Sequence, residues 1–132
     1  MLTYAALTGS TRHREAAATA LGVTRVLGGT YPRAAGWGLA ASSALLAGPR
    51  EIAIVGDDPG LIRAARMATS PGAVVAISPD ASGDPTAKPW APLLEQRGLV
   101  DGKPAAYVCA GFVCQRPVTA ERDLAALLAS RR

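Results

Sequence analysis

The first 48 residues carry apolar side chains at the spacing of amphipathic helices. This spacing predicts a short helix over about residues 2–9 and a second helix that begins after Ser10 or Thr11. A short side-chain oxygen at either position can accept a backbone N–H that the first helical turn leaves unpaired. The second helix is expected to end at Gly28-Gly29, because glycine readily adopts the conformation that follows a helix.

A third helix is expected over about residues 33–47. Gly36, Gly38 and several alanines would allow this helix to pack closely against a neighbour. Gly48-Pro49 predicts its end, because proline cannot continue a helix. Residues 1–48 are therefore expected to form a helical segment.

The pattern then changes to short apolar runs that are typical of buried strands. Residues 51–56, 73–77 and 105–109 are candidates, and the first two are partly β-branched and bounded by Gly or Pro. Asp57-Asp58-Pro59 predicts the start of a helix that continues to about residue 70. This order indicates that residues 49–132 form an α/β module around a small, mainly parallel, three-stranded Rossmann-like sheet with helices.

The remaining segments predict one loop and two further helices. Residues 78–89 are rich in Pro, Gly, Ser and Asp and are expected to form a surface loop. Residues 90–96 are expected to form a short helix with Trp90, Leu93 and Leu94 pointing inward. Thr119 is expected to cap a final helix whose leucines recur at helical spacing.

Composition and charge exclude several classes of protein. With 132 residues, 49% of them apolar and 18% charged, the chain is expected to fold as one globular unit. No apolar run reaches the length of a membrane span, and the start of the chain shows no signal peptide, so a cytoplasmic location is expected. The net charge is +4, but the arginines are scattered and few aromatic residues accompany them, so nucleic acid is not an expected partner.

Cys109 and Cys114 lie in the segment richest in reactive side chains, residues 106–119. On a straight strand, residues with this offset face opposite sides, so the two sulfurs can meet only if the chain turns back near Gly111. A cytoplasmic location favours packed thiols over a structural disulfide. The alternative is a redox role, in which Cys114 is the better candidate because it follows the expected strand and lies near Arg116.

The segment from Gly56 to Gly60 follows a strand and opens a helix, where Rossmann-like folds hold phosphate. Gly56, Asp57 and Asp58 are therefore candidate ligand-binding residues. The complete glycine fingerprint is missing, however, and two acidic residues would repel an anion. A helix start with Asp58 as N-cap and Pro59 in the first turn accounts for the same residues.

No catalytic or metal-binding set emerges from the rest of the chain. His13 is the only histidine and lies between two arginines, where a solvated side chain is expected. A single histidine supports neither a histidine-based metal site nor a Ser-His-Asp triad. No cofactor is expected.

Five segments together resemble the C-terminal region of the spermatogenesis-associated protein 20 family, which are thioredoxin-domain-containing proteins. The resemblance covers nearly the whole chain, and its most specific part runs from Tyr-Val-Cys at 107–109 to Pro-Val-Thr at 117–119. The segments follow one another in the order of the family, at residues 7–17, 32–36, 48–57, 100–109 and 114–119.

This resemblance implies a part of a larger protein. Family members carry a thioredoxin-like domain and an α/α barrel similar to sugar epimerases and six-hairpin glycosidases, which suggests carbohydrate metabolism. Residues 1–48 would be the last helices of that barrel, and residues 49–132 would be its α/β appendix. The thioredoxin-like domain and most of the barrel are absent here, so the open helices should need the rest of a parent chain or self-association.

Three functions follow as hypotheses. The first is a C-terminal structural module that has no activity alone. The second is a thiol-dependent redox module that uses Cys114 with Cys109 as its resolving partner. The third is a small Rossmann-like module that binds an anionic ligand at residues 56–60.

Overall fold

The computed structural model describes residues 1–68, 71–79 and 89–130. Most of the expected loop, residues 80–88, and the expected helix end at residues 69–70 lie outside the described residues. The described helices and strands follow one another in the order α1 (Leu2–Thr8), α2 (Thr11–Thr30), α3 (Gly36–Ala47), β1 (Glu51–Val55), α4 (Pro59–Arg66), β2 (Val74–Ser78), the 3₁₀ helix η1 (Pro92–Leu94), β3 (Ala105–Ala110), β4 (Val113–Cys114) and α5 (Glu121–Ala129).

The strands form one mixed sheet in the order β2-β1-β3-β4. The α/β class is confirmed, but within the described residues the sheet has four strands rather than three and is not mainly parallel. Only β1 and β2 are parallel, whereas β3 runs antiparallel to both β1 and β4. Val55, the last residue of β1, pairs with Ser78 at the end of β2 and with Ala105 at the start of β3. The connection from β2 to β3 therefore begins and ends at the same end of the strands.

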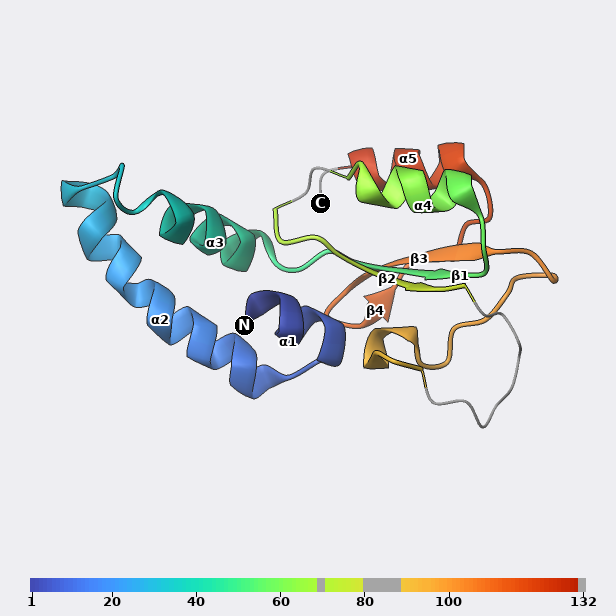
Figure 1. Cartoon of the computed structure of the whole chain (residues 1–132), viewed down its shortest axis with the longest axis horizontal. Helices are drawn as coiled ribbons and strands as arrows, with labels where there is room; N and C mark the ends of the chain where they lie inside the picture. Colours follow the sequence, from blue (N-terminus) through green and yellow to red (C-terminus); the bar gives the residue numbers. More distant parts are fainter. Residues whose placement is uncertain (69–70, 80–88, 131–132) are drawn as a thin grey trace.

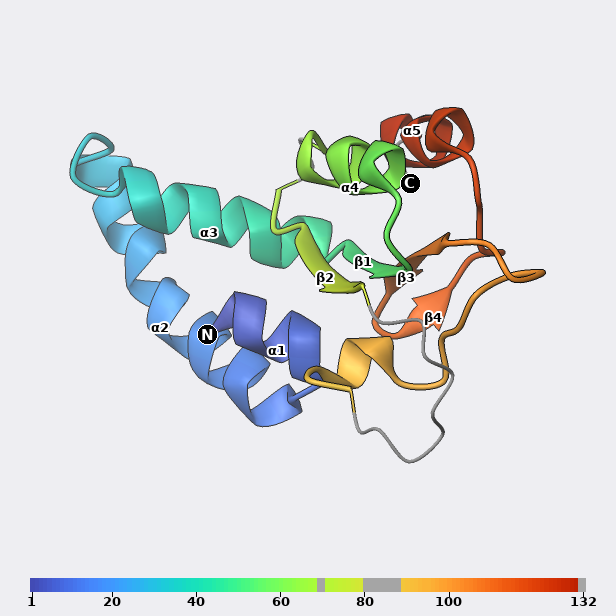
Figure 2. The ribbon, with the colours of Figure 1, turned by 45° about the vertical axis from the view of Figure 1, so that its right-hand side comes forward.

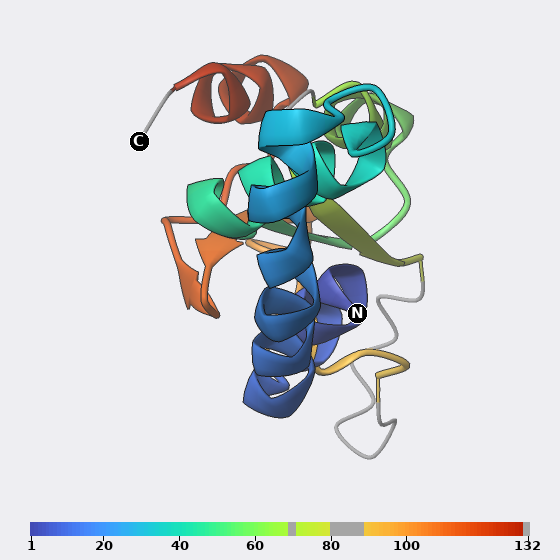
Figure 3. The same ribbon diagram turned by 90° about the vertical axis from the view of Figure 1, so that its left-hand side faces the viewer.

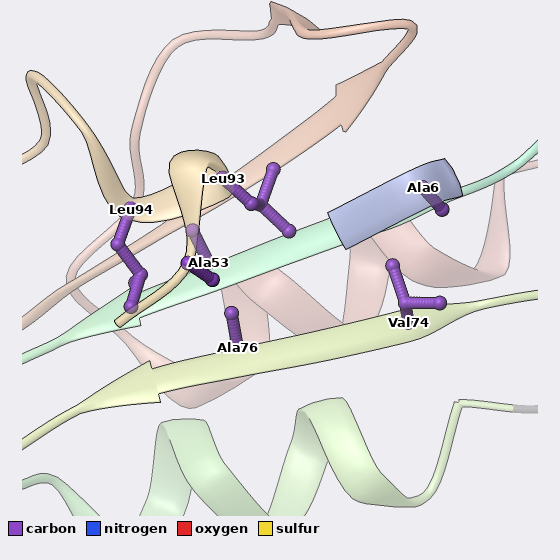
Figure 4. Packing of buried hydrophobic residues seen from close by; sticks show 7 residues of the cluster. Ala6, Ala53, Val74, Ala76, Leu93 and Leu94 are labelled. Carbon is purple, nitrogen blue, oxygen red and sulfur yellow. The ribbon is translucent and has the colours of Figure 1, made fainter. Parts of the chain in front are cut away.

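Helices cover both faces of the sheet (Figure 1). On one face α1 and η1 pack against the strands, and Figure 4 shows Leu93 and Leu94 beside Ala53 and Ala76. On the other face α4 and α5 bury the opposite side chains of β1 and β3, in the cluster Ile52, Ile54, Leu61, Ala65, Ala106, Val108 and Leu124. Every residue of β1 is buried, as expected of a central strand between two layers.

Helices α2 and α3 form a hairpin, called here the helical arm, that projects away from the sheet (Figures 1 and 2). Seen from its free end, the arm stands in front of α1 and the sheet rather than across a face of the sheet (Figure 3). Small residues allow its two helices to approach. A Cβ at Gly38 would lie 2.5 Å from Oγ1 of Thr24, and one at Gly28 would lie 3.2 Å from Cδ2 of Leu39.

Several local expectations are confirmed and others are wrong. Asp58 caps α4, where its Oδ1 accepts the backbone N–H of Leu61 at 2.8 Å. The last helix instead has Ala120 at its N-cap without a side-chain bond, so the expected cap at Thr119 is wrong. Trp90 does not point inward: it is 64% exposed, and its indole N–H donates to the carbonyl of Ile77.

The other helix boundaries differ by a few residues from those expected. The second helix passes through the paired glycines to Thr30, and the third begins at Gly36. Ser10 is the N-cap residue of α2, but its hydroxyl is bonded to Nδ1 of His13 rather than to a backbone N–H. The short helix expected over residues 90–96 is reduced to the single turn η1, which still buries Leu93 and Leu94.

The close contact at Gly38 generates a stability prediction. Gly22→Ala, also inside a helix but with open space around the new Cβ, should stabilise the chain by about 0.5–1 kcal/mol through helix propensity alone. Gly38→Ala gains the same propensity but forces its methyl group against Thr24. We expect it to be less stable than Gly22→Ala by about 1–3 kcal/mol in urea unfolding followed by circular dichroism. Equal stabilities would show that the two arm helices do not pack through this contact.

Candidate functional site

The two cysteines meet across a tight hairpin between β3 and β4. Cys109 and Cys114 are direct cross-strand partners and form a disulfide. Gly111 and Phe112 make the turn with φ values of 58° and 64°, and positive φ at both central residues is typical of the turns that join two antiparallel strands closely. The expectation of packed thiols is therefore wrong. Cys114 also does not lie beyond a strand but within β4.

The sulfurs differ in their access to solvent. Cys109 is 2% exposed and lies in the central part of the sheet, where its backbone pairs with that of Glu51. Cys114 is exposed on the edge strand. A reagent in solution can therefore reach Sγ of Cys114 more readily than Sγ of Cys109.

Arg97 reaches the disulfide from the segment that follows η1. Its Nη2 lies 2.9 Å from Sγ of Cys114 and 3.5 Å from Sγ of Cys109. Its Nη1 donates to the carbonyls of Leu93 and Glu95, so the side chain folds back over its own turn. Its Nε is buried and has no hydrogen-bond partner within the described part of the chain.

The backbone around Arg97 is held in an uncommon conformation. Gln96 has a φ of 58°, in the left-handed region that costs about 1–3 kcal/mol for a residue other than glycine. On the other side of Arg97, the carbonyl of Gly98 accepts the hydroxyl of Tyr107 at 2.9 Å. The Tyr107 hydroxyl thus ties this segment to β3, the strand that carries Cys109.

Glu51 is a buried carboxylate beneath the hairpin. It is 1% exposed, and its Oε2 accepts the backbone N–H of Phe112 at 2.7 Å. Burial raises the pKa of Glu51 above its ordinary value. Backbone N–H groups of Phe112 and Gly111 and the charges of Arg97 and Arg14 act in the opposite direction and favour the carboxylate.

The positive charge of Arg97 is also shaped by its surroundings. Burial lowers the pKa of its guanidinium, whereas the nearby Glu51 and Tyr107 raise it. The site therefore combines a desolvated cation, a buried carboxylate and a disulfide in one corner of the sheet. A desolvated cation next to cysteine sulfur is the arrangement that stabilises a thiolate.

The candidate ligand-binding residues Gly56 and Asp58, in the turn after β1, have structural roles. Gly56 has a φ of 90°, and a Cβ there would lie 2.9 Å from the ring of Pro104. Asp58 is the helix cap described above, and Asp57 is exposed. The carboxylate of Glu121 approaches Gly60 closely and pairs with Arg63 at 2.7 Å. Carboxylates thus surround this helix start, and the geometry gives no support to an anion there.

His13 belongs to the junction between α1 and α2. Its Nδ1 is bonded to the Ser10 hydroxyl at 2.7 Å, and its ring centre lies 4.5 Å from that of Tyr4. Across residues 1–68, 71–79 and 89–130, the structure holds no group of three His, Cys, Asp or Glu side chains that could bind a metal ion. In the same residues, no helix has both the length and the apolar character needed to span a membrane.

Comparison with models of known protein families, with curated proteins and with solved structures found no match to this chain. The arrangement of residues must therefore carry the functional argument. The sequence pointed to the cysteines but missed both charged residues beside them. Arg97 is 12 residues from Cys109, and Glu51 is 61 residues from Phe112, so no local spacing could have indicated either contact.

Glu51 generates a prediction about stability and pH. Its pKa is raised in the folded chain, so the native state keeps a proton that the unfolded state has already lost. Stability should therefore fall as pH rises from the ordinary carboxyl range through the raised pKa. Glu51→Gln keeps an acceptor for Phe112 but has no proton to lose, so this part of the pH dependence should disappear in urea titrations between pH 4 and pH 8.

Glu51→Ala separates the hydrogen bond from the charge. It leaves the buried N–H of Phe112 without a partner and should cost about 2–3 kcal/mol at neutral pH, whereas Glu51→Gln should stay within about 1 kcal/mol of the original chain. Equal losses for the two variants would contradict the role of Glu51 as the acceptor that holds the hairpin.

Proposed function

We propose that this chain is a non-catalytic C-terminal structural module of a larger cytoplasmic protein with an α/α barrel, as its resemblance to thioredoxin-domain-containing, epimerase-like proteins implies. The helical arm is the part that docks, and its partner is the set of helices that would complete such a barrel. The α/β module holds the arm in place. The carbohydrate chemistry of the parent would reside in the barrel and not in this chain.

The exposure of the uncharged helix α3 is the main support for this proposal. None of its residues is charged, and none is buried in the isolated chain. Trp37 is 93% exposed and Leu46 is 87% exposed. A helix without charged residues is normally covered by other protein, so α3 has the composition of an interior helix in an exposed position.

Helix α2 also exposes large apolar side chains. Val23, Val26 and Leu27 are exposed along it, and Tyr31 is exposed where the arm turns. Burying one large apolar side chain fully is worth about 1.5–3 kcal/mol. A partner that covered several of these side chains would gain enough free energy to form a stable complex after the cost of association.

The arm is oriented by contacts at its base. The ring of Phe112, at the tip of the hairpin, lies 3.3 Å from the position that a Cβ on Gly9 would take, and Gly9 and Ser10 link α1 to α2. Also at the base, near the C-terminal end of α3, Ala44 approaches Gly72, which precedes β2. The module therefore presents its apolar helices from two fixed points, which reduces the entropy cost of docking.

The direct test uses a protein of the resembling family from which the region equivalent to this chain has been deleted. We expect this chain to bind that truncated protein in a 1:1 complex, measured by sedimentation and by calorimetry. The double variant Trp37→Glu/Leu46→Lys keeps the net charge and places each charge where the helix dipole tolerates it. It should weaken the complex at least tenfold, because exposed aromatic and aliphatic anchors dominate such interfaces.

Met67→Glu provides the matched control. Met67 is an exposed apolar residue at the C-cap of α4 and does not belong to the arm, so its replacement should leave binding unchanged. Absence of binding by the unaltered chain would overturn the proposal. Self-association that the double variant abolishes, without binding to the truncated protein, would assign the arm to a second copy of this chain instead.

A further inference from the structure

We propose that the Cys109–Cys114 disulfide is a thiol-exchange site for small thiol reductants, in which Arg97 stabilises the cysteine thiolates that reduction produces. This inference is independent of the docking function, because it rests on the hairpin and the segment after η1 rather than on the arm. It assigns a chemical role to Arg97, whose guanidinium touches both sulfurs.

The hydrogen bonds of Arg97 support a role beyond packing. A neutral disulfide sulfur is a weak acceptor, yet Nη2 of Arg97 lies within contact of both sulfurs. The buried Nε of the same side chain has no hydrogen-bond partner among the described residues. A thiolate at either position would turn one of these weak contacts into a charge-assisted hydrogen bond. The reduced state therefore gains an interaction that the oxidised state lacks.

The chemical step follows from the unequal exposure of the sulfurs. A thiolate of the reductant attacks the exposed Sγ of Cys114, the S–S bond breaks, and its electron pair leaves with Sγ of Cys109. This produces a mixed disulfide on Cys114 and a thiolate on Cys109, whose sulfur lies 3.5 Å from the Arg97 guanidinium in the disulfide form.

A second thiolate of the reductant then attacks the reductant sulfur of the mixed disulfide. The products are the oxidised, disulfide form of the reductant and a thiolate on Cys114, whose sulfur lies 2.9 Å from Arg97 in the disulfide form. In total, two reductant thiols are oxidised and one protein disulfide is reduced to two cysteine thiols, which exchange protons with solvent according to pH. The reverse sequence oxidises the two cysteines at the expense of a small disulfide.

The hairpin is held by other contacts when the disulfide opens. The backbone N–H of Phe112 remains bonded to Glu51, and the ring of Phe112 remains against Gly9. Cys109 and Cys114 stay paired across the two strands, so the disulfide can form again without a search by the chain. A disulfide between cysteines only five positions apart also restricts the unfolded chain less than one that closes a long loop, which makes a purely stabilising role weaker.

The test compares the redox equilibrium of the whole chain with that of three variants. Each protein is equilibrated with mixtures of reduced and oxidised glutathione, then alkylated and analysed by mass spectrometry. The equilibrium constant for reduction should be about tenfold lower for Arg97→Gln than for the unaltered chain, which corresponds to about 30 mV. Arg97→Lys keeps the charge and should recover most of this difference. Arg116→Gln removes a charge two residues from Cys114 in sequence and should have no effect.

A second readout separates thiolate stabilisation from a structural effect. The alkylation rate of the reduced chain should rise with pH at a midpoint about one unit lower for the unaltered chain than for Arg97→Gln. Equal equilibrium constants for the unaltered chain and Arg97→Gln would overturn the inference. If circular dichroism shows that Arg97→Gln does not fold, the alkylation rate of the unaltered, reduced chain is instead compared with that of an unstructured cysteine peptide over the same pH range. Equal pH profiles would overturn the inference.

Discussion

The complete burial of β1 is the constraint on which the rest of the structure depends. This strand pairs with β2 on one side and β3 on the other, and both of its faces are covered. A strand in this position needs an apolar layer above and below, which α4 and α5 provide on one face and α1 and η1 on the other. The first residue of the strand, Glu51, is the polar exception, and the N–H group of Phe112 satisfies its carboxylate.

The β3–β4 hairpin connects this central strand to the arm. Its tip bonds to Glu51 through Phe112 and packs against Gly9 between α1 and α2, while its two strands carry the disulfide. The proposed docking surface and the proposed thiol-exchange site therefore share one structural support. The ring of Phe112 is the contact between the hairpin tip and the link that leads into the arm.

Several arginine side chains make contacts within the chain. Arg97 lies against the two sulfurs, and Arg50 donates to the carbonyls of Leu128 and Ser130 at the end of α5, where a positive charge complements the helix dipole. Arg63 pairs with Glu121 between α4 and α5 in an exposed bridge that adds little stability. These contacts spread over separate elements and do not gather into a basic surface.

The sequence by itself determined the elements whose signals are local. The β-branched run after Arg50, the cap at Asp58 and the glycine-bounded helices lie within a few residues of their expected positions, because periodicity and capping act over one or two turns. Only the tertiary structure decided the direction of β3, the pairing of Cys109 with Cys114 and the approach of Arg97 and Glu51 to the hairpin. These features depend on where chain segments distant in sequence meet. The packing of both faces of β1 sets these meeting points, and the neighbours of each residue in the sequence do not.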